Sequence, residues 1–158
     1  MSSRTLFIAL PAALLILGGG AANAGTTVAK VSAMACINDK WNESEPDKDH
    51  KLVDYAGRCV HIPDNQAVQA MSTEDCVESY EYMPDKTWKG AGTCTVVFKD
   101  GDKLYESWEE GSHLKESTFK ITAGTGKYQG ATGSGTYVYE LLTDTLSGGR
   151  YKGAIELP

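Results

Sequence analysis

The sequence lacks the short motifs that identify most metal and nucleotide sites. It contains no CxxC pair, no HxH or HExxH pattern, no Gly-x-Gly-x-x-Gly segment and no Gly-Lys-Ser/Thr loop. Zinc and phosphate groups are usually held by those spacings, so we expect neither a metal nor a cofactor. Basic residues are also in the minority, 15 against 21 acidic ones. A net negative charge argues against nucleic acid and anionic membrane surfaces as partners.

The first 24 residues have the layout of a secretion signal. Arg4 supplies a basic start, Leu6–Leu17 an apolar run, and Ala22–Ala24 a small-x-small cleavage site. The apolar run is shorter than the roughly 20 residues that a membrane-spanning helix needs. We therefore expect a cleaved signal peptide over 1–24, a mature chain in the periplasm or outside the cell, and no membrane contact after cleavage.

Every cysteine follows this segment, at Cys36, Cys59, Cys76 and Cys94. An even number of cysteines in a small exported protein predicts two disulfides, and four cysteines allow three connectivities. If the turn over 83–87 pairs Tyr82 with Trp88, Cys76 falls opposite Cys94, close enough to bridge. This register favours Cys76–Cys94 and leaves Cys36–Cys59, while the other two connectivities stay open.

The chain after residue 51 alternates short strand patterns with turns. Strands are expected over 53–62, 76–82, 88–98, 104–110, 114–122, 135–142 and 150–157, between turns rich in Gly, Pro and Asp. Upstream, Thr27–Ala35 predicts a first strand, and the polar segment 39–51 predicts an exposed loop. About eight strands without a long helix indicate an all-β fold, a single closed antiparallel β-barrel. Its parts are the N-terminal strand and loop at 25–51 and the barrel at 52–158, which form one structural unit.

The most distinctive segment is 121–137, ITAGTGKYQGATGSGTY, with five glycines. Glycines this dense between strands indicate bends, bulges or a close approach of two backbones. Residues 121–133 resemble the I-x-G-G-T-G-x-[FY]-x-G-A-x-G segment of the allene oxide cyclase and dirigent barrels, which are eight-stranded and of the calycin type. Ala123 stands where that pattern has its first glycine. The resemblance implies such a barrel in a bacterial secreted member, and a cyclase or isomerase acting inside the lumen.

One predicted strand contains the strongest catalytic candidates. Leu104, Glu106, Trp108 and Glu110 point to the same side of it. If that side faces the barrel interior, burial raises the pKa of Glu106, which could then act as an acid or a base. The alternative is a glutamate that pairs with a lysine or arginine, or one that faces solvent. His113, beside Glu110 at the rim, could move protons or bind a metal, or be an ordinary turn residue.

The chain is also rich in aromatic residues that a lumen can present to a ligand. Inward tyrosines and tryptophans give apolar walls with polar tips, which suit a small hydrophobic or amphipathic molecule. The ligand-binding candidates are Trp108, Tyr137, Tyr139, Tyr151, His61 and Arg150, the last as a partner for a ligand carboxylate. Core packing and, for Arg150, a surface salt bridge are the alternatives. Three functions stay open: a non-catalytic binder, a cyclase or isomerase, and a filled barrel acting through its surface.

Overall fold

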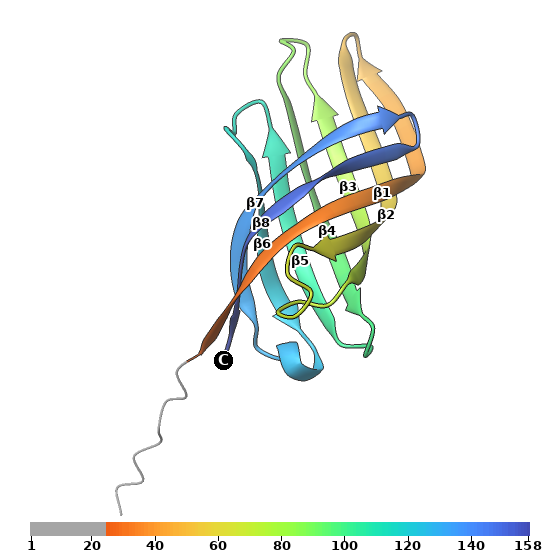
Figure 1. Ribbon diagram of the computed structural model, residues 1–158. Coiled ribbons are helices and arrows are strands. Elements are labelled where there is room, and N and C mark those ends of the chain that lie inside the picture. The colour runs from red at the N-terminus through yellow and green to blue at the C-terminus, as the bar shows by residue number, and fades with distance from the viewer. Residues whose placement is uncertain (1–24) are drawn as a thin grey trace, which may run out of the picture.

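The computed structural model describes residues 25–158, so the predicted signal peptide at 1–24 lies outside the described residues. The chain forms a closed antiparallel barrel in which each strand pairs with the next and β8 returns to β1 (Figure 1). The elements are β1 (Thr26–Asp47), β2 (His50–Pro63), β3 (Ser72–Tyr82), β4 (Trp88–Phe98), β5 (Lys103–Gly111), β6 (Ser117–Gly124), the 3-10 turn η1 (Gly126–Tyr128), β7 (Thr132–Thr143) and β8 (Leu146–Leu157). The predicted all-β, closed barrel of about eight strands is confirmed. Within 25–158, no helix is long and apolar enough to cross a membrane.

The inner face of the barrel follows from the alternation of side chains along each strand. On β5, Leu104, Glu106, Trp108 and Glu110 are buried, and the residues between them are more exposed. Successive side chains of a strand point to opposite faces, so these four side chains project into the barrel. The face predicted for this strand is therefore correct.

The glycine segment closes one end of the barrel. Tyr128 of η1 stacks on Phe98 of β4, with 4.5 Å between ring centroids. Gly126 and Gly130 have φ values of +54° and +77°, a conformation that glycine adopts without a steric penalty. Ala123 lies outside this left-handed region, which explains why alanine is accepted there. The segment is a structural corner, and the apolar core fills the interior beside it.

The polar segment 39–51 is not the exposed loop that its composition predicts. β1 continues to Asp47, β2 starts at His50, and the turn between them places Asp49 at a φ of +61°. The two strands pair through their backbones, which hydrogen-bond whatever the side chains are. Polar side chains on this ribbon are exposed, so no apolar alternation marked it as strand. Similarly, the predicted strands 135–142 and 150–157 extend toward each other, so that only residues 144–145 separate β7 from β8.

Both disulfides link neighbouring strands on the inner face. Cys76 lies opposite Cys94 and is bonded to it, in the register that also places Tyr82 opposite Trp88. The second bridge joins Cys36 of β1 to Cys59 of β2. The pairing favoured by the turn length is confirmed. All four half-cystines are buried, so they stiffen the barrel from within.

Candidate functional site

A cavity of about 110 Å³ opens at the end of the barrel opposite η1. Eight of its 19 lining residues are aromatic, with rings from six strands: Trp41, Tyr55, Tyr80, Tyr82, Trp108, Tyr137, Tyr139 and Tyr151. Both disulfides also line it. A dry cavity of about 150 Å³ holds one benzene molecule. At about 110 Å³ the space is smaller than that, so it suits a group no larger than one ring, with the rest of a ligand extending through the mouth.

Glycines on β4 make room for the rings. A Cβ atom at Gly92 would lie 2.7 Å from Cζ2 of Trp108, and one at Gly90 would lie 2.6 Å from Cδ1 of Tyr80. Real Cβ atoms do not approach ring carbons this closely, so larger residues would displace both rings. Tyr80 and Trp108 can instead lie 5.8 Å apart, centroid to centroid, against a wall without side chains.

Two carboxyl groups lie among tyrosine hydroxyls near the mouth. Tyr80 donates to Glu78 at 2.7 Å, and Tyr139 and Tyr137 donate to Glu110 at 3.1 and 3.4 Å. Burial raises the pKa of Glu78 to about 8, and the neighbouring Glu110 adds to the rise against the Tyr80 hydrogen bond. Burial also raises the pKa of Glu110. At neutral pH the cavity wall therefore presents a protonated carboxyl at Glu78.

Deeper in the barrel, Glu106 forms a buried ion pair with Lys30 of β1. The Lys30 ammonium also lies 4.5 Å from the centre of the Phe119 ring, a cation–π geometry. Burial raises the pKa of Glu106, Lys30 opposes this, and the charge of Glu74 adds to the rise. Glu106 is not among the residues that line the cavity. The lysine pairing that the sequence left as an alternative is the one the structure contains.

Next to this pair, Ser32, His61 and Glu74 form a buried hydrogen-bonded chain. His61 lies 3.2 Å from Ser32 through Nδ1 and 2.7 Å from Glu74 through Nε2. The order Ser–His–Glu is that of a hydrolase triad. However, of the three only Glu74 borders the cavity, so Ser32 has no substrate space beside it in the described part of the chain. The chain instead holds the Glu74 carboxylate in place.

Two residues of the cavity wall, here called its floor, each have a buried polar side-chain atom with no partner among the described residues. One is Oε1 of Glu74 and the other is Nε1 of Trp108. Burial raises the pKa of Glu74, but the His61 hydrogen bond and the charges of His61 and Lys30 outweigh it, and the pKa is lowered overall. The floor therefore holds an ionised acceptor and an N–H donor that no described residue pairs with.

The structure brings most of the predicted site residues together. Trp108, Tyr137, Tyr139, Tyr151 and Glu110 line the cavity, and His61 lies beneath it. The roles predicted for these residues stay predictions.

Two candidates, the rim residue His113 and the predicted carboxylate partner Arg150, lie outside the cavity. Arg150 is exposed and donates to Asp64 at 2.5 Å, and His113 is exposed, 3.3 Å from Glu109. Alternation explains Arg150, because its neighbour Tyr151 points inward. His113 lies in the turn after β5, beyond the part of the strand whose side chains enter the lumen.

Sequence reasoning missed Lys30, Glu74, Glu78 and Tyr80, although a signal for them exists. Once Cys76 is known to face inward, Glu74, Glu78 and Tyr80 must share its face, because they lie at even spacings from it. Lys30 has the same relation to Cys36. The position of the half-cystines thus identifies the inner faces of β1 and β3.

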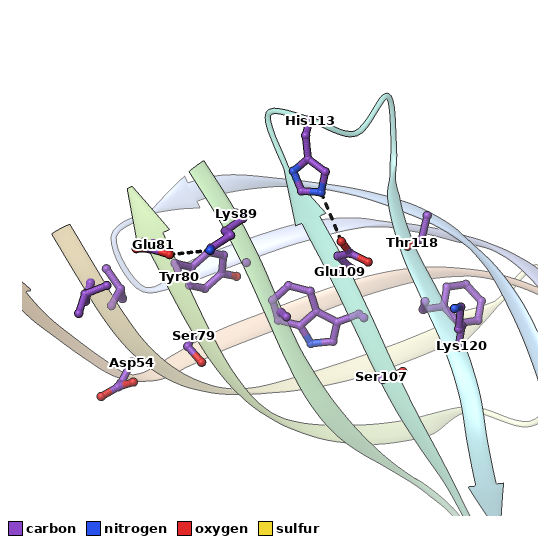
Figure 2. Close-up of a pocket in the computed structure, with 16 residues that line it drawn as sticks. Asp54, Ser79, Tyr80, Glu81, Lys89, Ser107, Glu109, His113, Thr118 and Lys120 are labelled. Atoms are coloured by element: carbon purple, nitrogen blue, oxygen red, sulfur yellow. Dashed lines mark hydrogen bonds and ion pairs between the residues drawn. The ribbon is translucent and has the colours of Figure 1, made fainter. Parts of the chain in front are cut away.

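A larger hollow, of about 590 Å³, lies along β2 to β6 (Figure 2). Four of its polar side chains form two ion pairs: Lys89 lies 2.7 Å from Glu81, and His113 pairs with Glu109. These four groups are exposed or half-buried. The lumen has less space but holds the buried, unpaired groups, so we assign the candidate site to it.

Neither a family model nor a curated protein sequence matches this chain. Among solved structures, the pterocarpan synthase dirigent protein GePTS1 matches with a TM-score of 0.53 and 10% identity, over 84% of this chain and 91% of that chain. The pterocarpan synthase dirigent protein PsPTS1 matches with a TM-score of 0.52 and 10% identity, over 84% and 96%. A protein with unknown function from Clostridium acetobutylicum matches with a TM-score of 0.48 and 12% identity, over 81% of this chain and 97% of that chain. At these identities the likeness concerns the fold, and the chain has a dirigent-like barrel fold.

Proposed function

We propose that the open end of the barrel binds one small hydrophobic or amphipathic molecule. The observation that supports this most directly is the aromatic cavity with an unpaired acceptor and an unpaired donor, Glu74 Oε1 and Trp108 Nε1, at its floor. A buried polar atom without a partner costs about 1–3 kcal/mol. A ligand that pairs with these atoms removes that penalty while it buries its apolar part against the rings. The alternative, a filled barrel that acts through its surface, agrees with the packed interior beside η1 but does not explain this cavity.

A ring-sized fluorinated probe tests the proposal. We expect 4-fluorobenzyl alcohol or 4-fluorobenzylammonium to give a saturable ¹⁹F NMR shift with the wild type. Ser147→Phe, which places a ring at a buried position on the cavity wall, should abolish the shift. Ser134→Phe is the matched control, because Ser134 is exposed on β7, and it should bind as the wild type does. Absence of binding by both probes, or equal binding by both variants, would overturn the proposal.

A second candidate function is an allene-oxide-cyclase-like cyclization or isomerization in the same lumen. The observation that favours it is the Glu78 carboxyl, whose pKa burial raises to about 8 on the cavity wall beside Tyr80. Such a group can give a proton to a reacting molecule near neutral pH. An allene oxide generated in the presence of the protein should then yield an excess of one product enantiomer, lost in Glu78→Gln. A racemic product with the wild type counts against catalysis and leaves binding untouched.

We further propose that the chain works in the periplasm of a bacterium or outside the cell. The signal-like pattern at 1–24 and two disulfides support this, because disulfides persist in oxidising compartments.

A further inference from the structure

We propose that the ligand of the lumen carries a positive charge, as a small protonated or quaternary amine, and that its cationic group lies between Glu78 and Glu110 within the aromatic wall. This rests on the proposed binding function and names the chemical class of its ligand.

The acidic and basic side chains that line the cavity are all acidic. Three glutamates, Glu74, Glu78 and Glu110, line it, and no lysine, arginine or histidine stands among the described residues of its wall. The nearest buried lysine, Lys30, is paired with Glu106 beneath the floor. An anionic ligand would therefore meet three carboxyl groups and no counter-charge, whereas a cation meets three partners.

The rings add an attraction that is specific to cations. Tyr80 lies among Tyr82, Trp88 and Trp108, with centroids 6.4, 6.4 and 5.8 Å away, and Tyr137 is stacked on Tyr151 at 5.1 Å. A cation within about 6 Å of a ring centre is attracted by the face of the ring, and aromatic cages bind quaternary ammonium groups in this way. The open mouth admits the apolar remainder of an amphipathic amine.

A buried acceptor points to the same ligand class independently of the rim carboxyls. Glu74 is 1% exposed and borders the cavity, and its Oε1 has no partner in the described part of the chain. A protonated amine can donate an N–H to this oxygen, and a quaternary ammonium group is attracted to it by charge alone, whereas a neutral hydrocarbon can do neither. The His61 bond occupies the other oxygen, so the carboxylate is already oriented.

The protonation of Glu78 should couple to the ligand's charge. In the empty cavity, burial raises the pKa of Glu78 to about 8. A bound cation favours the ionised carboxylate, so cation binding near pH 7 should release a proton. The titratable groups that interact with Glu78 are Glu74 and Tyr80 on its own strand, and Tyr55, Glu110, Tyr137, Tyr139 and Tyr151 on other strands.

Three probes of one shape test the proposal on the wild-type chain. Choline and 3,3-dimethyl-1-butanol present the same branched head as a cation and as a neutral group, and 3,3-dimethylbutyrate combines the neutral head with an anionic carboxylate. NMR titration should show choline binding at least tenfold more tightly than the alcohol, with the butyrate weakest. Choline binding should release a proton into a weakly buffered indicator solution, whereas the alcohol should release none. The double variant Glu78→Gln/Glu110→Gln should bring choline and the alcohol to within about threefold, while Glu109→Gln, on the outer face of β5, should keep the wild-type preference.

The outcomes separate this inference from the proposed function. If the alcohol binds as tightly as choline, and Ser147→Phe abolishes both, the lumen binds ligands but the cation preference is refuted. If choline is preferred but Ser147→Phe or the double variant leaves that preference unchanged, the cation binds elsewhere and the inference also fails. If no probe binds in a way that depends on Ser147, the proposed function fails with it. The wild-type comparison holds even if the double variant does not fold.

Discussion

Replacing Lys30 by methionine tests whether an ion pair lies within a dry barrel interior. Lys30 and Glu106 are both buried, and their partnership joins β1 to β5 across the lumen. Methionine keeps much of the apolar stem but removes the ammonium, so Glu106 is left as an unpaired buried carboxyl. Breaking a buried pair in this way costs about 3–5 kcal/mol. For a barrel of this size that corresponds to a fall of about 10–20 °C in the melting temperature.

The design is a double-mutant cycle measured by urea unfolding at pH 7.5, with the disulfides intact. Lys30→Met should lose about 3–5 kcal/mol, whereas Lys30→Met/Glu106→Leu should return to within about 1 kcal/mol of the wild type, because apolar groups can replace a buried pair. The penalty of Lys30→Met should shrink towards pH 5. The raised pKa of Glu106 lets the unpaired carboxyl take up a proton as the pH falls.

The control is Lys152→Met, an exposed position on β8, where we expect a change below about 0.5 kcal/mol. A loss of less than 1 kcal/mol for Lys30→Met, or a double variant whose loss equals the sum of the two single losses, would refute the reasoning. Either result would mean that water reaches the pair.

Three further perturbations test other parts of the barrel. Burial raises the pKa of Glu78 from 4.5 to about 8. The resulting stabilisation of the fold is complete below pH 4.5 and is lost as the pH rises through 8. Water offsets part of the shift, so the free energy of unfolding, measured in urea, should fall by about 1–2 kcal/mol between pH 5 and 9. Glu78→Gln should remove most of this pH dependence, and an unchanged pH dependence would contradict the raised pKa of Glu78. Replacing Cys76 and Cys94 by alanine opens a loop of 18 residues, which should cost about 3 kcal/mol in urea, and no loss would mean that the unfolded chain stays compact. Gly135→Val should lower the free energy of unfolding by at least about 1–3 kcal/mol, because the valine Cβ would lie 2.3 Å from the carbonyl oxygen of Lys152. An unchanged melting temperature would show that β8 moves to make room for the side chain.

Much of the fold could be predicted because its signals are local. Side-chain alternation placed Leu104, Glu106, Trp108 and Glu110 on one face, since the period of a strand does not depend on its partners. The register of Tyr82 with Trp88 followed from the length of one turn, and it carried Cys76 to Cys94. The exposed ribbon of β1 and β2 escaped prediction because its strands have no buried face to mark them.

The sequence by itself determined most of the strands, the inward face of β5 and the Cys76–Cys94 disulfide, because these depend on neighbours along the chain. Only the tertiary structure decided that Lys30 meets Glu106, 76 residues away, and that His61 meets Glu74. Closure of the sheet and its stagger set which inward residues share a level of the barrel. The cavity likewise depends on how the rings of β3, β5, β7 and β8 fill one cross-section, a sum of volumes from distant strands that no local pattern records.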